Sequence, residues 1–394
     1  MRPERANLTN WQEPPFNRWS FCHLSEIIPT APVSRGSGPV RPLGQTAPVD
    51  LAAVTVEHRG QRLLVSQTLE QSFVDALAVV DSDGLAVEWY GPEMSPDRSH
   101  LLMSVSKSLT STLTGRLVAD GVLRPDDMLT EHVAELAGDS FEGCRVQDLL
   151  DMRAGTLFSE DYDDLAADAR RYEEVAAWRP RSDASLPGDL YEYIRRLPNG
   201  RAHGGPFEYR SILTDVLGWV LEAASATRFA ELLSRELWTH LGAEHDAAVT
   251  VDQGGFALAD GGICTTLRDL ARVAQLQLHG GMIGDQVVVP VEWIDETTAA
   301  TSELREAYRS ATGVRHDRIE MYHNNWWVYD AARQVYAGHG IHGQLLYIDR
   351  LAGVGVLVLS SWPRPLDSGL HDLQLDVAAA LIEAATHAKA VSRH

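Results

Sequence analysis

Lysine is almost absent from this chain of 394 residues. Of its 34 basic residues, only Lys107 and Lys389 are lysines, and the rest are arginines. Arginine stays protonated at any physiological pH, so chemistry that needs an amine to accept a proton has only two candidate side chains. One of them, Lys107, stands three residues after Ser104. A Ser-x-x-Lys tetrapeptide arises by chance only about 0.1 times in a chain of this composition, so the pair is informative.

Cysteine, positive charge and long apolar runs are scarce as well. The three cysteines are scattered, with no Cys-x-x-Cys, which argues against a disulfide framework and a cysteine zinc site. A net charge of −21 argues against nucleic acid or an anionic membrane as a partner. No run of 18 apolar residues occurs and residues 1–25 lack an apolar core, so we expect a cytoplasmic protein with no membrane partner. The expected partner is a small molecule, bound by a monomer or homodimer.

The segment around Ser104 and Lys107 predicts the start of a helix. Leu109, Leu113 and Leu117 follow at helical spacing, and Gly121 is a plausible stop. A separation of three places both side chains on one face, one turn apart. A serine hydroxyl becomes a good nucleophile when an amine takes its proton, which requires that burial or nearby positive charge lowers the lysine pKa. The alternative is an ordinary surface lysine on an amphipathic helix.

The order of elements predicts an α/β unit built from both ends of the chain. Strand patterns with a hairpin signal occupy 72–90, helical patterns dominate 129–241, and strand patterns return at 249–251 and 326–359. A closing amphipathic helix is predicted over 373–388. We expect an α/β domain made of residues 1–130 and 249–394, interrupted by a helical domain at 131–248.

Two further segments have the composition of catalytic partners. Tyr209, before a predicted helix, could exchange protons with Ser104 and a leaving group, although a tyrosine in this position more often packs. The glycine-rich segment 338–344 could bring a backbone N–H close to an oxyanion. Its alternatives are a β-turn or a metal pair formed by His339 and His342, for which no third ligand stands at a familiar spacing.

These three segments occur in the order of the motifs of the class C β-lactamase and family VIII carboxylesterase superfamily. The chain resembles most closely its 6-aminohexanoate-dimer hydrolase branch. This resemblance rests on short blocks spread over nearly the whole chain: Trp11–Pro15, Asn17–Trp19, His100–Leu109, Glu160–Tyr162, Tyr209–Ser211, Asp215–Leu217, Arg268–Val273, Gly340–Gln344 and Ser360–Pro363.

The resemblance implies a β-lactamase/DD-peptidase-like α+β fold, with a central antiparallel sheet flanked by helices plus an all-helical domain. It implies Ser104 as the acyl-enzyme nucleophile, Lys107 as its base and Tyr209 as proton relay to the leaving group. The backbone N–H groups of Ser104 and Ile341 would form the oxyanion hole. No metal or organic cofactor is implied. The substrate-binding residues implied or inferred beside these are Tyr162, Glu173, Asp260, Trp327 and His342.

The chain also departs from the family pattern. Ser211 stands where the second motif more often has asparagine, and the third motif lacks the Lys-Thr-Gly of true β-lactamases. Asp260 stands where the nearest relatives place an amide or an imidazole. Glu173 lies where an acid can face the amino end of a substrate. We therefore expect Glu173 or Asp260 to contact a cationic amino group, the alternative being two solvated acids among 55.

The function expected from these features is that of a serine hydrolase acting on short-chain carboxylic esters and on small linear amides such as 6-aminohexanoate dimer. One alternative is a D-amino-acid peptidase or β-lactamase-like enzyme. Another is a non-catalytic binding or sensing protein on the same scaffold. Intact Ser104, Lys107 and Tyr209 argue against the last, and the absence of Gly-x-Ser-x-Gly argues against the α/β-hydrolase fold.

Overall fold

The centre of the molecule is a seven-stranded antiparallel sheet, seen in the computed structural model, which describes residues 5–138, 140–312 and 315–392. In spatial order its strands are β11 (Met321–His323), β12 (Trp326–Asp330), β13 (Val335–Gly340), β14 (Gln344–Asp349), β15 (Val354–Ser360), β4 (Val74–Asp81) and β5 (Leu85–Tyr90). The strand patterns predicted at 72–90 and 326–359 are thus confirmed, including the hairpin turn between β4 and β5.

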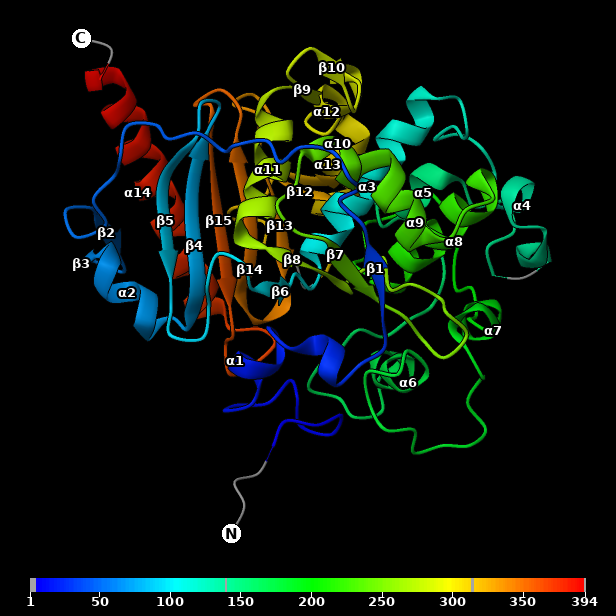
Figure 1. The fold of residues 1–394 in the computed structure, drawn as a ribbon. Coiled ribbons are helices and arrows are strands. Elements are labelled where there is room, and N and C mark those ends of the chain that lie inside the picture. Colours follow the sequence, from blue (N-terminus) through cyan, green and yellow to red (C-terminus); the bar gives the residue numbers. More distant parts are fainter. Residues whose placement is uncertain (1–4, 139, 313–314, 393–394) are drawn as a thin grey trace.

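Both ends of the chain build this sheet, as predicted. β15 pairs with β4 in antiparallel register from Val354 opposite Asp81 to Leu359 opposite Ala76. Successive β4 residues point to opposite faces, so Ala76 and Ala78 join one hydrophobic cluster while Leu77 and Val79 join another. Helix α11 (Leu267–Leu278) contacts the first face and α14 (Ser368–Ser392) the second, as Figure 1 shows. Burial on both faces explains why β4 and β15 are almost entirely apolar.

A second, four-stranded sheet leads into the helix that follows Ser104. Its spatial order is β1 (Thr30–Val33), β7 (Ala247–Thr250), β8 (Ile263–Thr266) and β6 (Ser99–Leu101). Strand β1 was not predicted, because it lies in an N-terminal arm without periodicity. Two hairpins complete the strands: β2 (Thr55–His58) with β3 (Gln61–Leu64), and β9 (Met282–Ile283) with β10 (Gln286–Val287).

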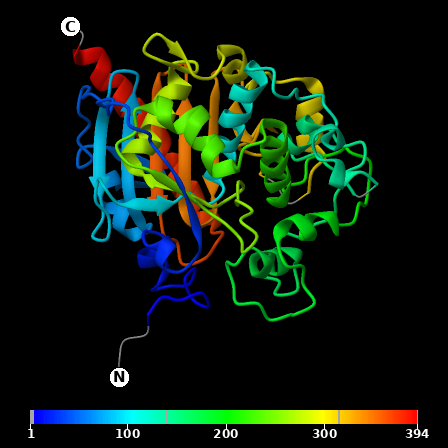
Figure 2. The same cartoon turned by 45° about the vertical axis from the view of Figure 1, so that its right-hand side comes forward.

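The middle of the chain is helical and lies to one side of the large sheet in both views (Figures 1 and 2). Its helices are α4 (Leu129–His132), α5 (Val146–Leu150), α6 (Asp168–Val175), α7 (Leu190–Arg195), α8 (Ile212–Ser225), α9 (Phe229–Leu233) and α10 (Thr239–Leu241), with a 3-10 turn η2 (Ala134–Leu136) and a π turn η3 (Ser234–Trp238). The remaining helical elements are α1 (Asn17–Ser20), η1 (Leu24–Glu26), α2 (Val65–Gln71), α3 (Val105–Ala119), α12 (Val291–Glu296), α13 (Ser302–Arg309) and η4 (Ile341–Gly343).

Helix α3 runs through the interior between the sheet and the middle helices. It contacts β13 and β14 on one side and α8 on another, and nearly all of its residues are buried. No helix within the described ranges combines the length and the apolar character needed to cross a bilayer.

Candidate active site

Ser104 stands at the N-terminal end of α3, immediately after a strained residue. Met103 has a φ of 46°, in the left-handed region that non-glycine residues rarely adopt, and this turn carries the chain from β6 into the helix. The backbone N–H of Lys107 donates to the carbonyl of Ser104, which makes Ser104 the N-cap. Ser104 is partly exposed whereas Met103 and Val105 are buried, so the turn presents this hydroxyl to a cavity.

The Lys107 side chain is buried and uses all three of its N–H donors. Its Nζ donates to Ser104 Oγ at 2.9 Å, to Ser211 Oγ at 3.0 Å and to the backbone carbonyl of Asp260 at 2.9 Å. The predicted pairing of the serine with the lysine therefore exists, and the surface-lysine alternative is wrong since Lys107 is 1% exposed.

The pKa of Lys107 differs from the expectation. Burial is the largest single influence and lowers this pKa, but the electrostatic effects of the titratable side chains Tyr209, Asp260, Glu160 and Asp215 outweigh it, so the pKa lies above its ordinary value. Asp260 Oδ2 lies 3.7 Å from Lys107 Nζ. The expectation that the surroundings lower this pKa is wrong, because carboxylates from three other segments surround the amine. Three oxygen acceptors at 2.9–3.0 Å from Nζ, together with the raised pKa, favour the ammonium form of Lys107 in the resting site.

Tyr209 lies beside the ammonium, just before α8. Lys107 Nζ is 5.2 Å from the centroid of its ring, and the ring stacks on Trp327 with centroids 5.3 Å apart and planes 23° apart. Burial raises the pKa of Tyr209, and Lys107 opposes this only in part, so the phenol is protonated at neutral pH. A protonated phenol next to the serine can donate to a leaving group.

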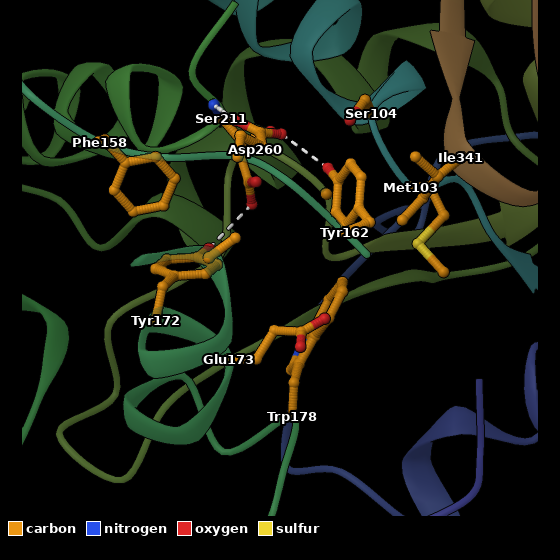
Figure 3. A pocket seen from close by; sticks show the side chains of 13 residues that line it. Met103, Ser104, Phe158, Tyr162, Tyr172, Glu173, Trp178, Ser211, Asp260 and Ile341 are labelled. Carbon is orange, nitrogen blue, oxygen red and sulfur yellow. Dashed lines mark hydrogen bonds between the residues drawn. The ribbon is translucent and has the colours of Figure 1, made fainter. Parts of the chain in front are cut away.

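Two cavities meet at Ser104. The narrow cavity has a volume of about 40 Å³, and its lining includes Met103, Tyr172, Glu173, Trp178 and Asp260. The wide cavity has a volume of about 520 Å³, and its lining includes Tyr209, Trp327, Ile319, Trp362, Leu366 and His371. Ser104, Glu160, Tyr162 and Ile341 line both. Figure 3 shows Tyr162 standing between Asp260 and Tyr172 on one side and Met103 and Ile341 on the other.

The predicted substrate-binding acids both lie in the wall of the narrow cavity, and each already has partners. Glu173 accepts from Arg170 Nη1 at 2.9 Å, from Arg179 Nε and from Gln12 Nε2 at 3.2 Å. Asp260 pairs with Lys107 and accepts from the hydroxyl of Tyr172 at 3.1 Å. Neither acid is solvated, since each is 6% exposed, so the alternative of two surface acids is wrong.

His342 lies away from both cavities. Its ring is 1% exposed, packs against Phe21 and places Nδ1 2.7 Å from the Trp362 carbonyl. Burial lowers the pKa of this imidazole to about 4, so it is neutral. His342 was expected among the substrate-binding residues, but its buried position away from both cavities does not support a contact with substrate. His342 fixes the loop, and its neighbour Ile341 faces the cavities.

Three polar residues that touch this centre were not assigned a role from sequence. Glu160 Oε1 accepts from Ser211 Oγ at 2.5 Å and from the Tyr162 hydroxyl at 2.7 Å. Ser211 had been noticed only as a departure from the family motif. Tyr172, which also donates to Asp215 Oδ2 at 2.6 Å, was missed too. Nothing local marks the Glu160–Ser211 or Tyr172–Asp215 contact, because the two residues of each pair are distant in sequence.

A metal pair of His339 and His342 does not form. Nε2 of His339 lies 2.6 Å from the Tyr329 hydroxyl, whereas His342 faces the Trp362 carbonyl. Within residues 5–138, 140–312 and 315–392, no group of three or more histidine, cysteine or acidic side chains has a metal-binding arrangement.

Gly340 allows β13 to approach the nucleophile turn closely. A Cβ at this position would stand 2.7 Å from the Leu102 carbonyl oxygen and 2.9 Å from Met103 Cβ. Gly340→Ala is therefore expected to push Ile341 away from Ser104, lowering kcat about 10-fold or more and stability by about 1–3 kcal/mol. Steady-state kinetics and urea unfolding measure both. Gly38→Ala, where a Cβ meets nothing within 4 Å, is the control and should leave kcat unchanged.

Known proteins resemble this chain in sequence and in fold. The beta-lactamase family model matches residues 64–381. The chain is 39% identical over 378 residues, 95% of its length and 94% of the relative's, to a 6-aminohexanoate-dimer hydrolase of Paenarthrobacter ureafaciens. A structure from Bacillus anthracis named "Putative 6-aminohexanoate-dimer hydrolase" superposes with a TM-score of 0.85 at 23% identity, covering 97% of this chain and 96% of that one. A second structure, named "EstCE1, a hydrolase with promiscuous acyltransferase activity", gives a TM-score of 0.61 at 15% identity, covering 80% of this chain and 96% of that one.

Proposed function

The chain belongs to the beta-lactamase family and is a serine hydrolase, and from this premise we propose that it cleaves short-chain carboxylic esters and small linear amides through an acyl-enzyme on Ser104. The observation that carries the proposal is the 2.9 Å contact between Lys107 Nζ and Ser104 Oγ at the junction of two cavities. A nucleophile with a paired amine, open to a cavity on each side, can accommodate a substrate with its scissile bond between the two.

The order of proton transfers in the proposed reaction follows from where Lys107 and Tyr209 lie around Ser104. Ser104 Oγ attacks the substrate carbonyl as its proton passes to Lys107, and the oxyanion is stabilised by the N–H groups of Ser104 and Ile341. Tyr209 lines the wide cavity and not the narrow one, so the leaving group occupies the wide cavity, where this phenol protonates it. The acyl group then occupies the narrow cavity until water hydrolyses the ester to Ser104.

The division of the chain into residues 1–130, 131–248 and 249–394 fits this assignment. Ser104 and Lys107 come from the first part, and Tyr162 and Tyr209 from the second. The third part supplies Asp260, Trp327 and Ile341. We propose that the active site lies where the helical domain meets the α/β domain.

A substrate panel combined with covalent trapping tests the proposal. We expect turnover of p-nitrophenyl acetate and of 6-aminohexanoate dimer, the compound in the name of the 39% identical relative. A fluorophosphonate should label the peptide that contains Ser104, as read by mass spectrometry. A label elsewhere would mean that another residue is the nucleophile. Faster turnover of a cephalosporin or a D-alanyl ester would favour the peptidase or β-lactamase alternative, and a stable adduct without turnover would favour a binding protein.

We propose that the narrow cavity binds a cationic amino group through Glu173 or Asp260. For 6-aminohexanoate dimer, Glu173→Gln or Asp260→Asn is expected to raise KM about 10-fold or more, because a charge-assisted hydrogen bond is lost. The KM for p-nitrophenyl acetate, which has no amino group, is the internal control and should change little. If both variants leave the KM for the dimer unchanged, neither acid binds the amine.

A further inference from the structure

Glu160 holds a central position beside the nucleophile without touching it. Its carboxylate lines both cavities and is the end point of three hydrogen bonds. Ser211 donates from Oγ at 2.5 Å and also from its backbone N–H, and Tyr162 donates from its hydroxyl at 2.7 Å. Burial is the largest influence on Glu160 and raises its pKa, against the opposing effects of Lys107, Ser211 and Tyr162. A carboxylate with a raised pKa takes up a proton readily.

The Ser211 hydroxyl connects this carboxylate to the catalytic amine. Lys107 Nζ donates to Ser211 Oγ at 3.0 Å, and Ser211 Oγ in turn donates to Glu160 Oε1 at 2.5 Å. Both bonds therefore point in the same direction, from the ammonium through the hydroxyl to the carboxylate. A hydroxyl that accepts on one side and donates on the other can pass a proton along such a chain.

The resting charge of Lys107 creates the need for such a path. An ammonium has no lone pair, so it cannot take the proton of Ser104 until it has lost one of its own. Its other two hydrogen bonds end on Ser104 Oγ, the group to be deprotonated, and on the Asp260 backbone carbonyl, which does not hold a proton. The Asp260 carboxylate is 3.7 Å away, beyond hydrogen-bond distance. Glu160, through Ser211, is the acceptor that a continuous hydrogen-bonded chain reaches.

We propose that Ser211 and Glu160 form a proton relay that turns Lys107 from an ammonium into the neutral base of the reaction. Lys107 gives one proton to Ser211 Oγ while Ser211 gives its own to Glu160 Oε1, leaving an amine and a carboxylic acid with no change in net charge. The amine then takes the proton of Ser104 as Oγ attacks the carbonyl. Both residues act on the reaction through Lys107, whose Nζ donates to Ser211 Oγ. This inference rests on the proposed function of Ser104.

Removing the carboxylate tests the relay through the pH profile. Glu160→Gln keeps the side-chain shape, and kcat at neutral pH is expected to fall about 100-fold with KM changed less than about 3-fold. Wild-type kcat should fall on the acid side as Glu160 becomes protonated. In Glu160→Gln, kcat should instead keep rising with pH, since Lys107 can then reach the neutral form only by losing its proton to solvent. A purely structural role would not produce this alkaline recovery.

The charged groups around Glu160 and Ser211 decide whether Glu160→Gln should raise or lower kcat at neutral pH. Glu160 is one of the negative charges that raise the pKa of Lys107; the charged or titratable neighbours of the pair are Tyr162, Tyr209, Arg210, Asp215 and Asp260. If Glu160 only held this pKa high, Glu160→Gln would give more neutral amine and equal or faster turnover at neutral pH. That outcome would overturn the relay.

Variants of Ser211 test the hydroxyl separately. Ser211→Ala breaks the chain while keeping Glu160, so a similar loss of about 100-fold is expected, and combining it with Glu160→Gln should add little further loss. Ser211→Thr restores a hydroxyl and should restore kcat, which a simple packing role would not require. Full activity in Ser211→Ala would overturn the relay.

A neighbouring carboxylate provides the matched control. Glu208 lies three residues before Ser211, and its side chain is 44% exposed. It pairs with Arg201 and Arg210 on the surface. Glu208→Gln removes one negative charge near the site without touching the relay, and kcat should stay within about 2-fold of wild type. All variants are assayed with one substrate whose turnover requires Ser104, and folding is checked by thermal melting. If no substrate shows Ser104-dependent turnover, the proposed function fails; if turnover is present and insensitive to Glu160 and Ser211, only the relay fails.

Discussion

Ser104→Ala is expected to lower kcat for ester hydrolysis by about 10⁴-fold or more. An alanine cannot form the acyl-enzyme, and what remains is the effect of binding and oxyanion stabilisation on attack by water. The change removes one oxygen from a partly exposed turn, so the fold is expected to be retained. Initial rates with p-nitrophenyl acetate measure the loss against the uncatalysed background. Turnover that survives this variant would show that the nucleophile has been wrongly assigned.

Ser106 provides a control for this variant on the same helix. Its Oγ accepts from the Ile263 backbone N–H at 3.1 Å, and it is buried away from both cavities. Ser106→Ala should therefore keep kcat within a few-fold of wild type, whereas stability falls by about 1–3 kcal/mol because a buried N–H loses its acceptor. The two serine variants thus separate a chemical loss from a structural one. Similar activity losses in both would point to disruption of α3 rather than to a missing nucleophile.

Tyr209→Phe is expected to separate amide cleavage from ester cleavage. An amine must be protonated as it leaves, while an alkoxide or phenolate leaves more easily, so the missing phenol proton costs the amide more. We expect kcat/KM to fall about 10³- to 10⁴-fold for 6-aminohexanoate dimer and about 10- to 100-fold for p-nitrophenyl acetate. Phenylalanine keeps the stacking on Trp327, so the shape of the wide cavity should be preserved.

Tyr322 is the matched control for Tyr209. It packs edge-on against both Tyr209 and Trp327, and its hydroxyl faces Asn325 Oδ1 at 3.4 Å rather than a cavity. Tyr322→Phe should change neither substrate's kcat/KM by more than about 3-fold. Equal losses for ester and amide in Tyr209→Phe would contradict leaving-group protonation by Tyr209 and leave it a role in binding alone.

Those features that depend on local spacing could be predicted from the sequence. Ser104 and Lys107 are one helical turn apart, and their meeting follows from helix geometry. The cap of α11 is equally local: the side chain of Thr266 accepts from the Asp269 N–H, and the helix begins directly after it. The strand β1 was missed because Thr30–Val33 has no periodicity of its own, and it is held by pairing with Ala247–Thr250.

Long-range electrostatics could not be predicted in the same way. Burial alone lowers a lysine pKa, which was the direction expected for Lys107. The carboxylates that reverse this direction come from Glu160, Asp215 and Asp260, which only the tertiary fold brings to the amine. Glu160 and Ser211 likewise meet across two separate segments. The residues of the proposed relay could be identified only once the fold was known.

The pairing of β4 with β15 has a consequence for when activity can first appear. During synthesis from the N-terminus, Ser104 and Lys107 emerge early, whereas β13, Ile341 and β15 emerge only near the end. Until β15 adds to β4, that strand lacks its neighbour on one side, and the proposed oxyanion donor at Ile341 is not yet in place. Such distant pairing is slow to form because a long loop must close first. On the proposed function, a nascent chain on the ribosome would carry Ser104 without a working site, and hydrolysis would begin only after β13 and β15 are in place.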